Sequence, residues 1–232
     1  MKQLVIFFLL VTNCMWAQSD FEKGEKLFQK KQYAPARTAF ESVVKTTPNN
    51  LKAIEYLGDI AGAEKKWDTA LVYYKKLKLT KPSEADYFYK YGGALGMKAL
   101  TVNKFKALGM IDEVKGSFEK SIQLDSKHIP ARWALIELYL QLPAIVGGSE
   151  SKAVAYSDQL QRISAVDGYL SQGRIDEYFK RYKMAEEQYK KAVTVGGTKI
   201  CYQKLADLYQ NKMEQPDKAK IVLEEYKKKI SN

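Results

Sequence analysis

Apolar side chains recur three and four residues apart along most of the chain, with polar and charged positions between them. Clear examples are the stripe Ala131, Leu135, Leu138 and Leu142 and the stripe Ala185, Tyr189 and Ala192. An α-helix completes a turn every 3.6 residues, so this spacing places the apolar side chains on one helix face. No segment alternates convincingly with a period of two, as a half-buried strand would. The pattern therefore predicts an all-α protein built from amphipathic helices.

Proline and glycine positions predict where these helices begin and end. Five prolines fall at the predicted breaks, namely Pro48, Pro82, Pro130, Pro143 and Pro216. A proline lacks the backbone N–H that a helix interior needs, so it interrupts or starts a helix. Ser149, which follows Gly147 and Gly148, reads as the N-cap of a helix after a turn. The helices are therefore short and joined by tight turns.

The same residue types return at one fixed spacing near the start of the chain. The matched pairs, all separated by the same interval, are Gly24 and Gly58, Tyr33 and Trp67, Ala36 and Ala70, Phe40 and Tyr74, and Pro48 and Pro82. Small residues let two helices approach closely, and aromatic residues fill the space beside them. The proline ends the second helix. Five matches at one spacing indicate a tandem repeat.

This unit resembles the tetratricopeptide repeat, a helix-turn-helix of about 34 residues, which is the interval of the five pairs. The resemblance implies an α-α superhelical solenoid of about six repeats and about twelve helices, in a single domain over residues 18–232. The repeats are expected at approximately residues 18–50, 51–84, 85–128, 129–165, 166–199 and 200–232. The third repeat carries an insertion of about ten residues around Met97–Met110, and the fourth carries about five residues around Leu142–Gly148.

Residues 1–17 have the anatomy of a secretory signal peptide. Lys2 precedes an unbroken apolar run of eight residues, 4–11, which is too short to span a bilayer. We expect cleavage after Ala17 and export to the periplasm. The leader resembles those of exported proteins of Gram-negative bacteria, the Bacteroidetes group in particular. The alternative is that Cys14 becomes the lipid-anchored N-terminus of an outer-membrane lipoprotein.

Composition and charge limit which partners and which side-chain roles are expected. The chain has 38 Lys+Arg against 27 Asp+Glu, a formal net charge of +11 that alone would suggest a nucleic-acid partner. Since an exported protein rarely meets nucleic acid, we expect no such partner and assign the surplus to solubility and attraction to the envelope. The single histidine, His128, is expected at a surface or turn position. Cys201, the one cysteine after the leader, is expected to be buried.

The sequence lacks the common catalytic motifs. It contains no GxxxxGK[ST], no GxGxxG after a strand, no GxSxG, no HExxH and no CxxC. One histidine cannot supply a multi-histidine metal site, and one mature cysteine cannot form an intramolecular disulfide. We therefore expect no enzymatic activity, no cofactor and no metal.

The resemblance implies that the first helix of every repeat lines a concave groove that holds peptides or helices of other proteins. By register, the candidate partner-binding residues are Glu55, Tyr56, Asp59, Tyr89, Lys90, Trp133, Glu137, Arg174 and Tyr178. Tyrosine and tryptophan bring large contact areas, and charges fix the register of a partner. Structural alternatives stay open: Trp133 packs between helices, and Glu55 with Asp59 forms a solvated or lysine-paired face. Without a cleft that shifts their pKa values, two such carboxylates form no acid–base pair.

The two insertions suggest a second binding surface. Both lie at the link between the first and second helix of a repeat, so we expect them to project from one edge and to pack on each other. The candidate docking residues on this edge are Leu100, Phe105, Leu108, Ile145 and Val146. The segment Met97–Met110 keeps helical apolar spacing, which indicates a lengthened hairpin. The alternative is that the longer helices only cover the loop and add core.

These features together predict a non-enzymatic scaffold or adaptor of the bacterial cell envelope that binds a protein or peptide. Two other functions stay open. One is an accessory lipoprotein of outer-membrane assembly, anchored through Cys14. The other is a binder of an anionic polysaccharide or cell-wall ligand, which would lose its affinity as salt rises.

Overall fold

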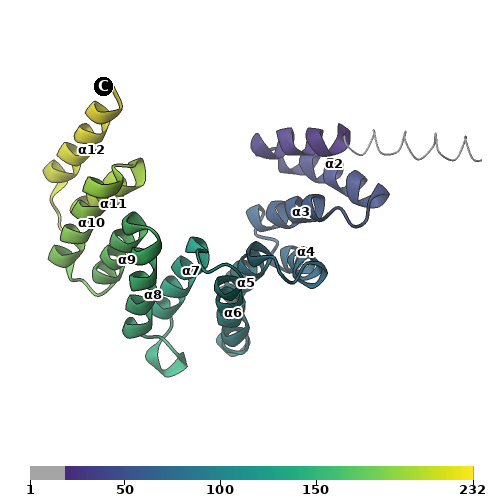
Figure 1. Cartoon of the computed structure of the whole chain (residues 1–232), viewed down its shortest axis with the longest axis horizontal. Helices are drawn as coiled ribbons and strands as arrows, with labels where there is room; N and C mark the ends of the chain where they lie inside the picture. The colour runs from purple at the N-terminus through teal and green to yellow at the C-terminus, as the bar shows by residue number, and fades with distance from the viewer. Residues whose placement is uncertain (1–18, 232) are drawn as a thin grey trace, which may run out of the picture. The chain divides into compact units, whose positions relative to one another are not determined.

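The computed structural model describes residues 19–231, which form helices joined by short turns (Figure 1). The described residues divide into two compact units, unit 1 (residues 19–124) and unit 2 (residues 125–231). Within the described residues no strand occurs, as the helical periodicity predicted. The predicted signal peptide, residues 1–17, and Cys14 lie outside the described part of the chain.

Unit 1 is a series of helical hairpins. Its helices are residues 19–29, α2 (Tyr33–Thr46), α3 (Leu51–Ala63), α4 (Trp67–Thr80), α5 (Ala85–Ala99) and α6 (Lys104–Leu124). From α2 onward, each helix packs against the next one in the chain. Because the turns between them are short, consecutive helices run antiparallel.

Unit 2 repeats this arrangement. Its helices are α7 (Ile129–Gln141), the short 3₁₀ turn η1 (Ala144–Val146), α8 (Glu150–Ile163), α9 (Ala165–Tyr178), α10 (Tyr182–Gly196), α11 (Lys199–Asn211) and α12 (Pro216–Ser231). The first helices of its hairpins, α7, α9 and α11, also contact one another in order. Each hairpin therefore stacks on the next, as repeats of one kind do.

A glycine facing an aromatic ring sets the separation of the two helices in most hairpins. The pairs are Gly24 with Phe40, Gly58 with Tyr74, Gly92 with Phe118 and, in unit 2, Gly173 with Tyr189. A β-carbon added at Gly58 or at Gly173 would lie 2.5 Å from the facing ring, which leaves no room for a side chain. Most of these pairs are 16 residues apart, but Gly92 and Phe118 are 26 apart. The ten extra residues confirm the insertion predicted for the third repeat.

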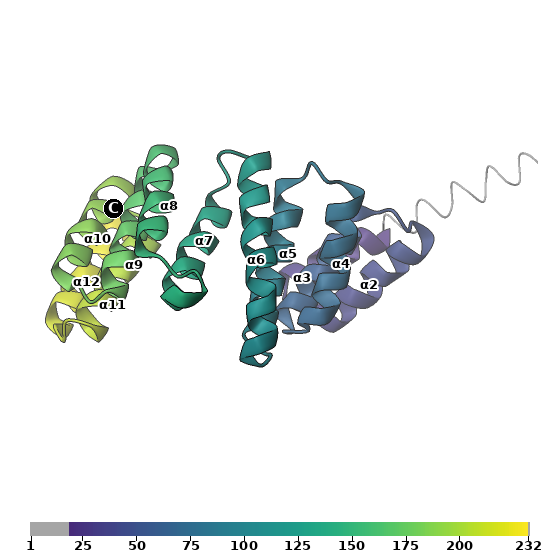
Figure 2. The same cartoon turned by 90° about the horizontal axis from the view of Figure 1, so that it is seen from below.

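The first insertion lengthens α6, which has 21 residues against 14 in α2 and in α4. Figure 2 shows α6 as a long, straight helix that reaches past the end of α5. The buried residues of α6 begin at Val114, and residues 104–113 contain no buried side chain. The lengthened hairpin was predicted correctly, and its extra turns add little to the core.

The second insertion forms the link between α7 and α8. Pro143 leads into η1, and Gly147 then adopts a left-handed conformation with φ of +100°. The Ser149 hydroxyl accepts the backbone N–H of Lys152 at 3.3 Å, so Ser149 is the N-cap of α8 as its sequence context predicted.

The turn inside four of the hairpins holds a residue other than glycine in the left-handed conformation. These residues are Lys31, Lys65, Lys180 and Glu214, with φ values of 58°, 59°, 60° and 55°. At Lys65, the backbone N–H donates to the carbonyl of Gly62 at 2.9 Å, and that of Lys66 donates to Ala61 at 2.8 Å. These two bonds are those of a Schellman motif, in which glycine is the usual residue. The absence of glycine left this shared turn without a signal in the sequence.

His128 occupies a turn position, one of the two predicted for it. It lies at the turn before α7, but only 5% of its surface is exposed. Its Nδ1 accepts the backbone N–H of Ala131 at 3.0 Å, so the ring folds back over the first turn of α7 as a helix cap. The turn position is the alternative observed, and the capping role buries the ring instead of leaving it at the surface. Cys201 is fully buried, as expected.

A single residue, Ser164, joins α8 to α9. It is both the C-cap of α8 and the N-cap of α9. Its hydroxyl lies 2.6 Å from Asp167 Oδ2, to which it donates, and it accepts the Asp167 backbone N–H at 3.3 Å. The link therefore has no unconstrained residue.

Candidate functional site

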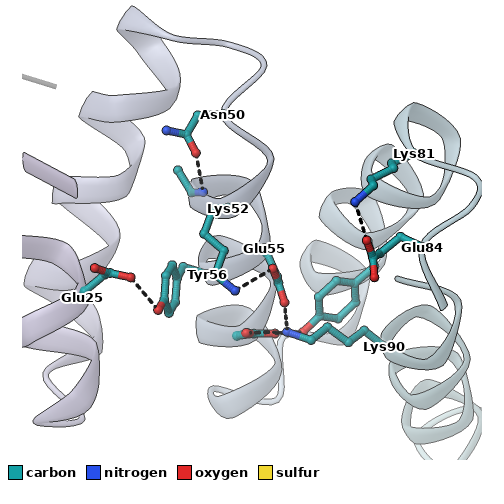
Figure 3. Close-up of polar contacts among 11 residues, drawn as sticks. Glu25, Asn50, Lys52, Glu55, Tyr56, Lys81, Glu84 and Lys90 are labelled. Atoms are coloured by element: carbon teal, nitrogen blue, oxygen red, sulfur yellow. Dashed lines mark hydrogen bonds and ion pairs between the residues drawn. The ribbon is translucent and has the colours of Figure 1, made fainter. Parts of the chain in front are cut away.

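In unit 1 the polar side chains of α3 and α5 meet in a cluster of three charges, Glu55, Asp59 and Lys90, which we call the unit 1 charge cluster. Figure 3 shows Lys90 reaching from its own helix to Glu55. The Lys90 ammonium lies 2.6 Å from Glu55 Oε1 and 2.7 Å from Asp59 Oδ2. The exposed fractions of these side chains are 12% for Glu55, 24% for Asp59 and 23% for Lys90. The lysine-paired alternative for the two carboxylates is therefore the one observed.

The pKa shifts in this cluster favour the charged forms. Burial opposes ionisation of Glu55, but hydrogen bonds and charge attraction from Lys90 and Lys52 hold its pKa below the usual range. Burial also opposes the charge on Lys90, but Asp59 and Glu55 raise the pKa of its ammonium. The carboxyl of Glu55 therefore stays ionised near neutral pH, which does not suit a general acid.

Two tyrosine hydroxyls border the cluster. Tyr74 donates to Asp59 at 2.7 Å. Tyr56 donates to Glu25 at 2.9 Å (Figure 3). Burial, followed by the hydrogen bond to Glu25, raises the pKa of Tyr56 to about 12. Burial and the Asp59 charge raise the pKa of Tyr74 as well. Both phenols therefore remain neutral hydrogen-bond donors, which hold the neighbouring carboxylates in place.

The rings of two predicted contact residues in unit 1 pack between helices. The Tyr56 ring stacks on Phe40, with centroids 4.6 Å apart and planes 6° from parallel, and meets Phe28 at 5.0 Å. The Tyr89 ring lies 6.0 Å from that of Phe118. These aromatic rings therefore contribute mainly to the packing of unit 1.

In unit 2 the corresponding helices, α7 and α9, carry a two-bond ion pair. Arg174 donates from Nε to Glu137 Oε1 at 2.8 Å and from its second nitrogen to Oε2 at 3.0 Å. The Arg174 guanidinium also lies over the Tyr178 ring, 5.6 Å from its centroid. Tyr178 is 42% exposed and packs edge-to-face with Phe179 at 5.2 Å. This face therefore presents an exposed aromatic ring beside a guanidinium held in one orientation.

Trp133 both packs in unit 2 and forms part of its polar face. Its ring lies against the buried core of the unit, which includes Tyr202 and Leu205. Its Nε1 donates to Asp167 Oδ1 at 2.8 Å, and Asp167 is the residue held by Ser164. Packing between helices, one of the two roles considered for Trp133, is thus observed together with a hydrogen bond to the next repeat. We call Trp133, Glu137, Asp167, Arg174 and Tyr178 the unit 2 polar face.

Most of the predicted groove charges thus meet one another within their own unit. Three partners of the predicted groove residues were not predicted from the sequence, namely Glu25, Tyr74 and Asp167. Asp167 follows Trp133 by one repeat length, so a search for polar pairs at that interval would have found it. Tyr74 was assigned only a packing role, because its ring position in the repeat says nothing of its hydroxyl.

Comparison with known proteins identifies the architecture. No protein-family profile matches the sequence, and no curated protein matches it. Among solved structures, TTC0263, a thermophilic TPR protein of Thermus thermophilus, has a TM-score of 0.66 at 17% identity, covering 86% of this chain and 98% of its own. A tetratricopeptide repeat protein from Parabacteroides merdae ATCC 43184 has a TM-score of 0.62 at 16% identity, covering 91% and 78%. The chain has the tetratricopeptide-repeat fold. YrrB, described as a TPR protein with an unusual peptide-binding site, has a TM-score of 0.51 at 13% identity, covering 78% and 87%.

The predicted docking edge of this tetratricopeptide-repeat chain consists mainly of exposed apolar residues. In unit 1 the exposed fractions are 72% for Leu100, 88% for Phe105 and 44% for Leu108. In unit 2 Ile145 is 93% exposed, and Val146 is half-buried. Because these residues belong to different units, the packing of one insertion on the other stays a prediction.

Residues 19–231 contain no candidate metal-binding cluster and no candidate membrane-spanning helix. No group of three or more His, Cys, Asp or Glu side chains in this range is arranged to hold a metal ion. In the same range, no helix has the length and apolar character that a membrane span requires.

Proposed function

We propose that the protein is a non-enzymatic scaffold of the bacterial cell envelope that binds protein or peptide partners through the first-helix faces of its repeats. The observation that carries this proposal is the arrangement of the unit 2 polar face. Glu137 fixes the Arg174 guanidinium, and the exposed Tyr178 ring lies beside it. Aromatic and arginine side chains held in this way lose little entropy on binding, and they dominate the energy of many protein interfaces.

The unit 1 charge cluster supports the same proposal in a different way. It carries two carboxylates for one lysine, and Lys52, whose side chain is 57% exposed, lies 3.1 Å from Glu55. An approaching basic side chain could therefore take the place of Lys52 at Glu55. YrrB, which shares the fold, has a peptide-binding site according to its description, and a peptide is the simplest partner for this face.

A site-specific cross-linking experiment tests the binding face. The photo-cross-linking amino acid benzoylphenylalanine would replace Tyr178 in cells that express the full chain, and captured proteins would be identified by mass spectrometry. Val72, which is 68% exposed on α4, supplies the matched control position. We expect a defined partner at position 178 and none at position 72. Equal capture at both positions, or none at either, would overturn the proposed face.

The same cells test the proposed location. We propose export to the periplasm, supported by the charged and apolar pattern of residues 1–17. The alternative is an outer-membrane lipoprotein anchored through Cys14. The intact mass of the purified protein separates them, because cleavage after Ala17 leaves an unmodified N-terminus and lipidation leaves an acylated Cys14. A mass that retains residues 1–17 would contradict both.

A further inference from the structure

The turn between α5 and α6 carries a group of exposed apolar side chains. This hairpin tip comprises Met97, Leu100, Phe105 and Leu108, with exposed fractions of 43%, 72%, 88% and 44%. Single exposed apolar residues are common on protein surfaces, but a group at the end of one hairpin indicates a binding surface.

The charged residues within the tip segment itself, residues 97–111, have one sign. Residues 97–111 contain Lys98, Lys104 and Lys106 and no Asp or Glu. Lys98 forms an ion pair with Asp68 of α4, whereas Lys104 and Lys106 are exposed at the start of α6. The partner of this tip should therefore be both apolar and negatively charged.

The form of the tip favours a lipid surface over a folded protein. The tip is the end of a hairpin (Figure 2). The first ten residues of α6 contain no buried side chain. Strong protein contacts are made in packed pockets that exclude water, and a projecting turn offers none. At a bilayer, by contrast, Phe and Leu enter the acyl boundary while adjacent lysines lie among the phosphates.

We propose that the α5–α6 tip docks on an anionic phospholipid bilayer. Phe105 and Leu100 enter the interfacial region, and Lys104 and Lys106 contact the headgroup phosphates. Because Lys104 and Lys106 flank Phe105 in the sequence, charged and apolar groups would meet the bilayer at the same point. This surface is separate in sequence from the residues proposed to bind a protein partner and adds a membrane contact to that function.

Vesicle flotation of the full mature chain tests this proposal. The vesicles would contain phosphatidylcholine alone or with about 30% phosphatidylglycerol, at low and high salt. We expect binding to the anionic vesicles that weakens as salt rises. The double variant Leu100→Ser/Phe105→Ser should lower the partition coefficient at least about tenfold, because both apolar side chains leave the interface. Lys104→Gln/Lys106→Gln should lower it severalfold and flatten its salt dependence.

Matched controls separate the tip from general surface effects. Val72→Ser/Leu79→Ser removes two apolar side chains, each 68% exposed on α4 of the same unit, and Lys30→Gln/Lys75→Gln removes two exposed charges elsewhere. Both controls should bind vesicles as the wild type does. Circular dichroism and the melting temperature would confirm that every variant is folded.

Three outcomes would overturn the proposal. They are absence of wild-type binding to anionic vesicles, an equal loss in the control variants, and cross-linking from position 105 in cells to a protein instead of to lipid. Tyr178→Ala should leave vesicle binding unchanged, because it alters only the unit 2 polar face. The proposed membrane contact and the proposed protein-binding face can therefore be disproved independently.

Discussion

The first-helix faces of the two units use equivalent positions with different chemistry. Glu55 and Asp59 of α3 correspond to Trp133 and Glu137 of α7, which follow them by two repeats plus the ten-residue insertion. In unit 1, both carboxylates share the ammonium of Lys90. In unit 2, Glu137 has the Arg174 guanidinium and Trp133 donates to Asp167. Each face thus joins one repeat to the next.

The repeat determines where these side chains lie, and the individual residues determine which bonds they form. The repeat places two side chains one turn apart on the first helix, directed at the following repeat. Which bond forms there depends on the residue supplied by that next helix. In unit 1, Lys90 pairs with both acids and the exposed Lys52 pairs with Glu55 alone, whereas the unit 2 contacts are distributed over separate pairs. Loss of one partner should therefore have unequal consequences in the two units.

The largest effect is expected at the glycines that face an aromatic ring, a packing arrangement that both units share. Gly58→Val in unit 1 and Gly173→Val in unit 2 each force a side chain into an aromatic ring that a β-carbon already approaches to 2.5 Å. We expect each to lower the free energy of unfolding by about 3 kcal/mol, since overpacking displaces the ring. Urea denaturation gives the magnitude, and hydrogen exchange shows which unit is weakened.

A neighbouring glycine supplies the control for that experiment. A β-carbon at Gly93 of α5 would meet no atom within 4 Å, so Gly93→Ala should stabilise its helix by up to about 1 kcal/mol. A small effect of valine at only one of the two tested positions would mean that the hairpins do not share the same packing.

Removing the cation from each first-helix face tests whether the two units lose different amounts of stability. Lys90→Met leaves Asp59 without its ion-pair partner and leaves Glu55 with only the exposed Lys52, so it should cost unit 1 about 2 kcal/mol. Arg174→Met should cost unit 2 about 1 kcal/mol or less, since Glu137 is one-third exposed and water can solvate it. Chemical denaturation measures both losses.

A second variant distinguishes charge repulsion from lost packing. Adding Asp59→Asn to Lys90→Met removes one of the two facing charges, so the double variant should recover part of the lost stability. If it is no more stable than Lys90→Met alone, the cost arises from packing of the lysine chain. The difference between the stability lost in Lys90→Met and that lost in Arg174→Met would then need another cause.

The pH dependence of stability should reveal the unit 1 charge cluster. Although burial opposes its charge, Lys90 and Lys52 lower the pKa of Glu55 from the ordinary value of 4.5. The ionised carboxylate thus stabilises unit 1 above about pH 4.5, and this stabilisation is lost as the pH falls through the folded-state pKa. Denaturation of wild type and Glu55→Gln should show a stability difference at neutral pH that narrows in acid. A constant difference would rule out this contribution.

The smallest effect concerns the turns that the units have in common. Lys65→Gly and Lys180→Gly replace residues held at φ of 59° and 60°, a conformation that disfavours a β-carbon. We expect each to raise the free energy of unfolding by up to about 1 kcal/mol, after the entropy that glycine gains in the unfolded chain. Lys183→Gly, in the first turn of α10, should instead destabilise by up to about 1 kcal/mol.

The fold could be predicted from the sequence because its signals repeat. The constant repeat interval and the facing small and aromatic residues are consequences of helix packing, and five matches outweigh any single ambiguity. The size of the α5–α6 insertion also followed from spacing alone. The lysine-filled turns did not, because residues at left-handed φ are recognised by glycine and these turns have none.

The candidate site was harder to predict than the fold. Register indicated that Glu55, Asp59 and Lys90 share a face, but it did not show that the lysine would lie between the two acids. The turn position of His128 could be predicted, but the sequence did not show that its ring caps α7 and is buried. Pairing and burial depend on side-chain conformation, which periodicity does not specify.

The single-residue link at Ser164 has a mechanical consequence. Most links between hairpins have several residues that could stretch under load, such as residues 81–84 between α4 and α5. The Ser164 link cannot extend in this way, because Ser164 caps both helices and its hydroxyl is hydrogen-bonded to Asp167. A pull transmitted through α8 would therefore reach α9 directly, so these two helices should yield together as one stiff element.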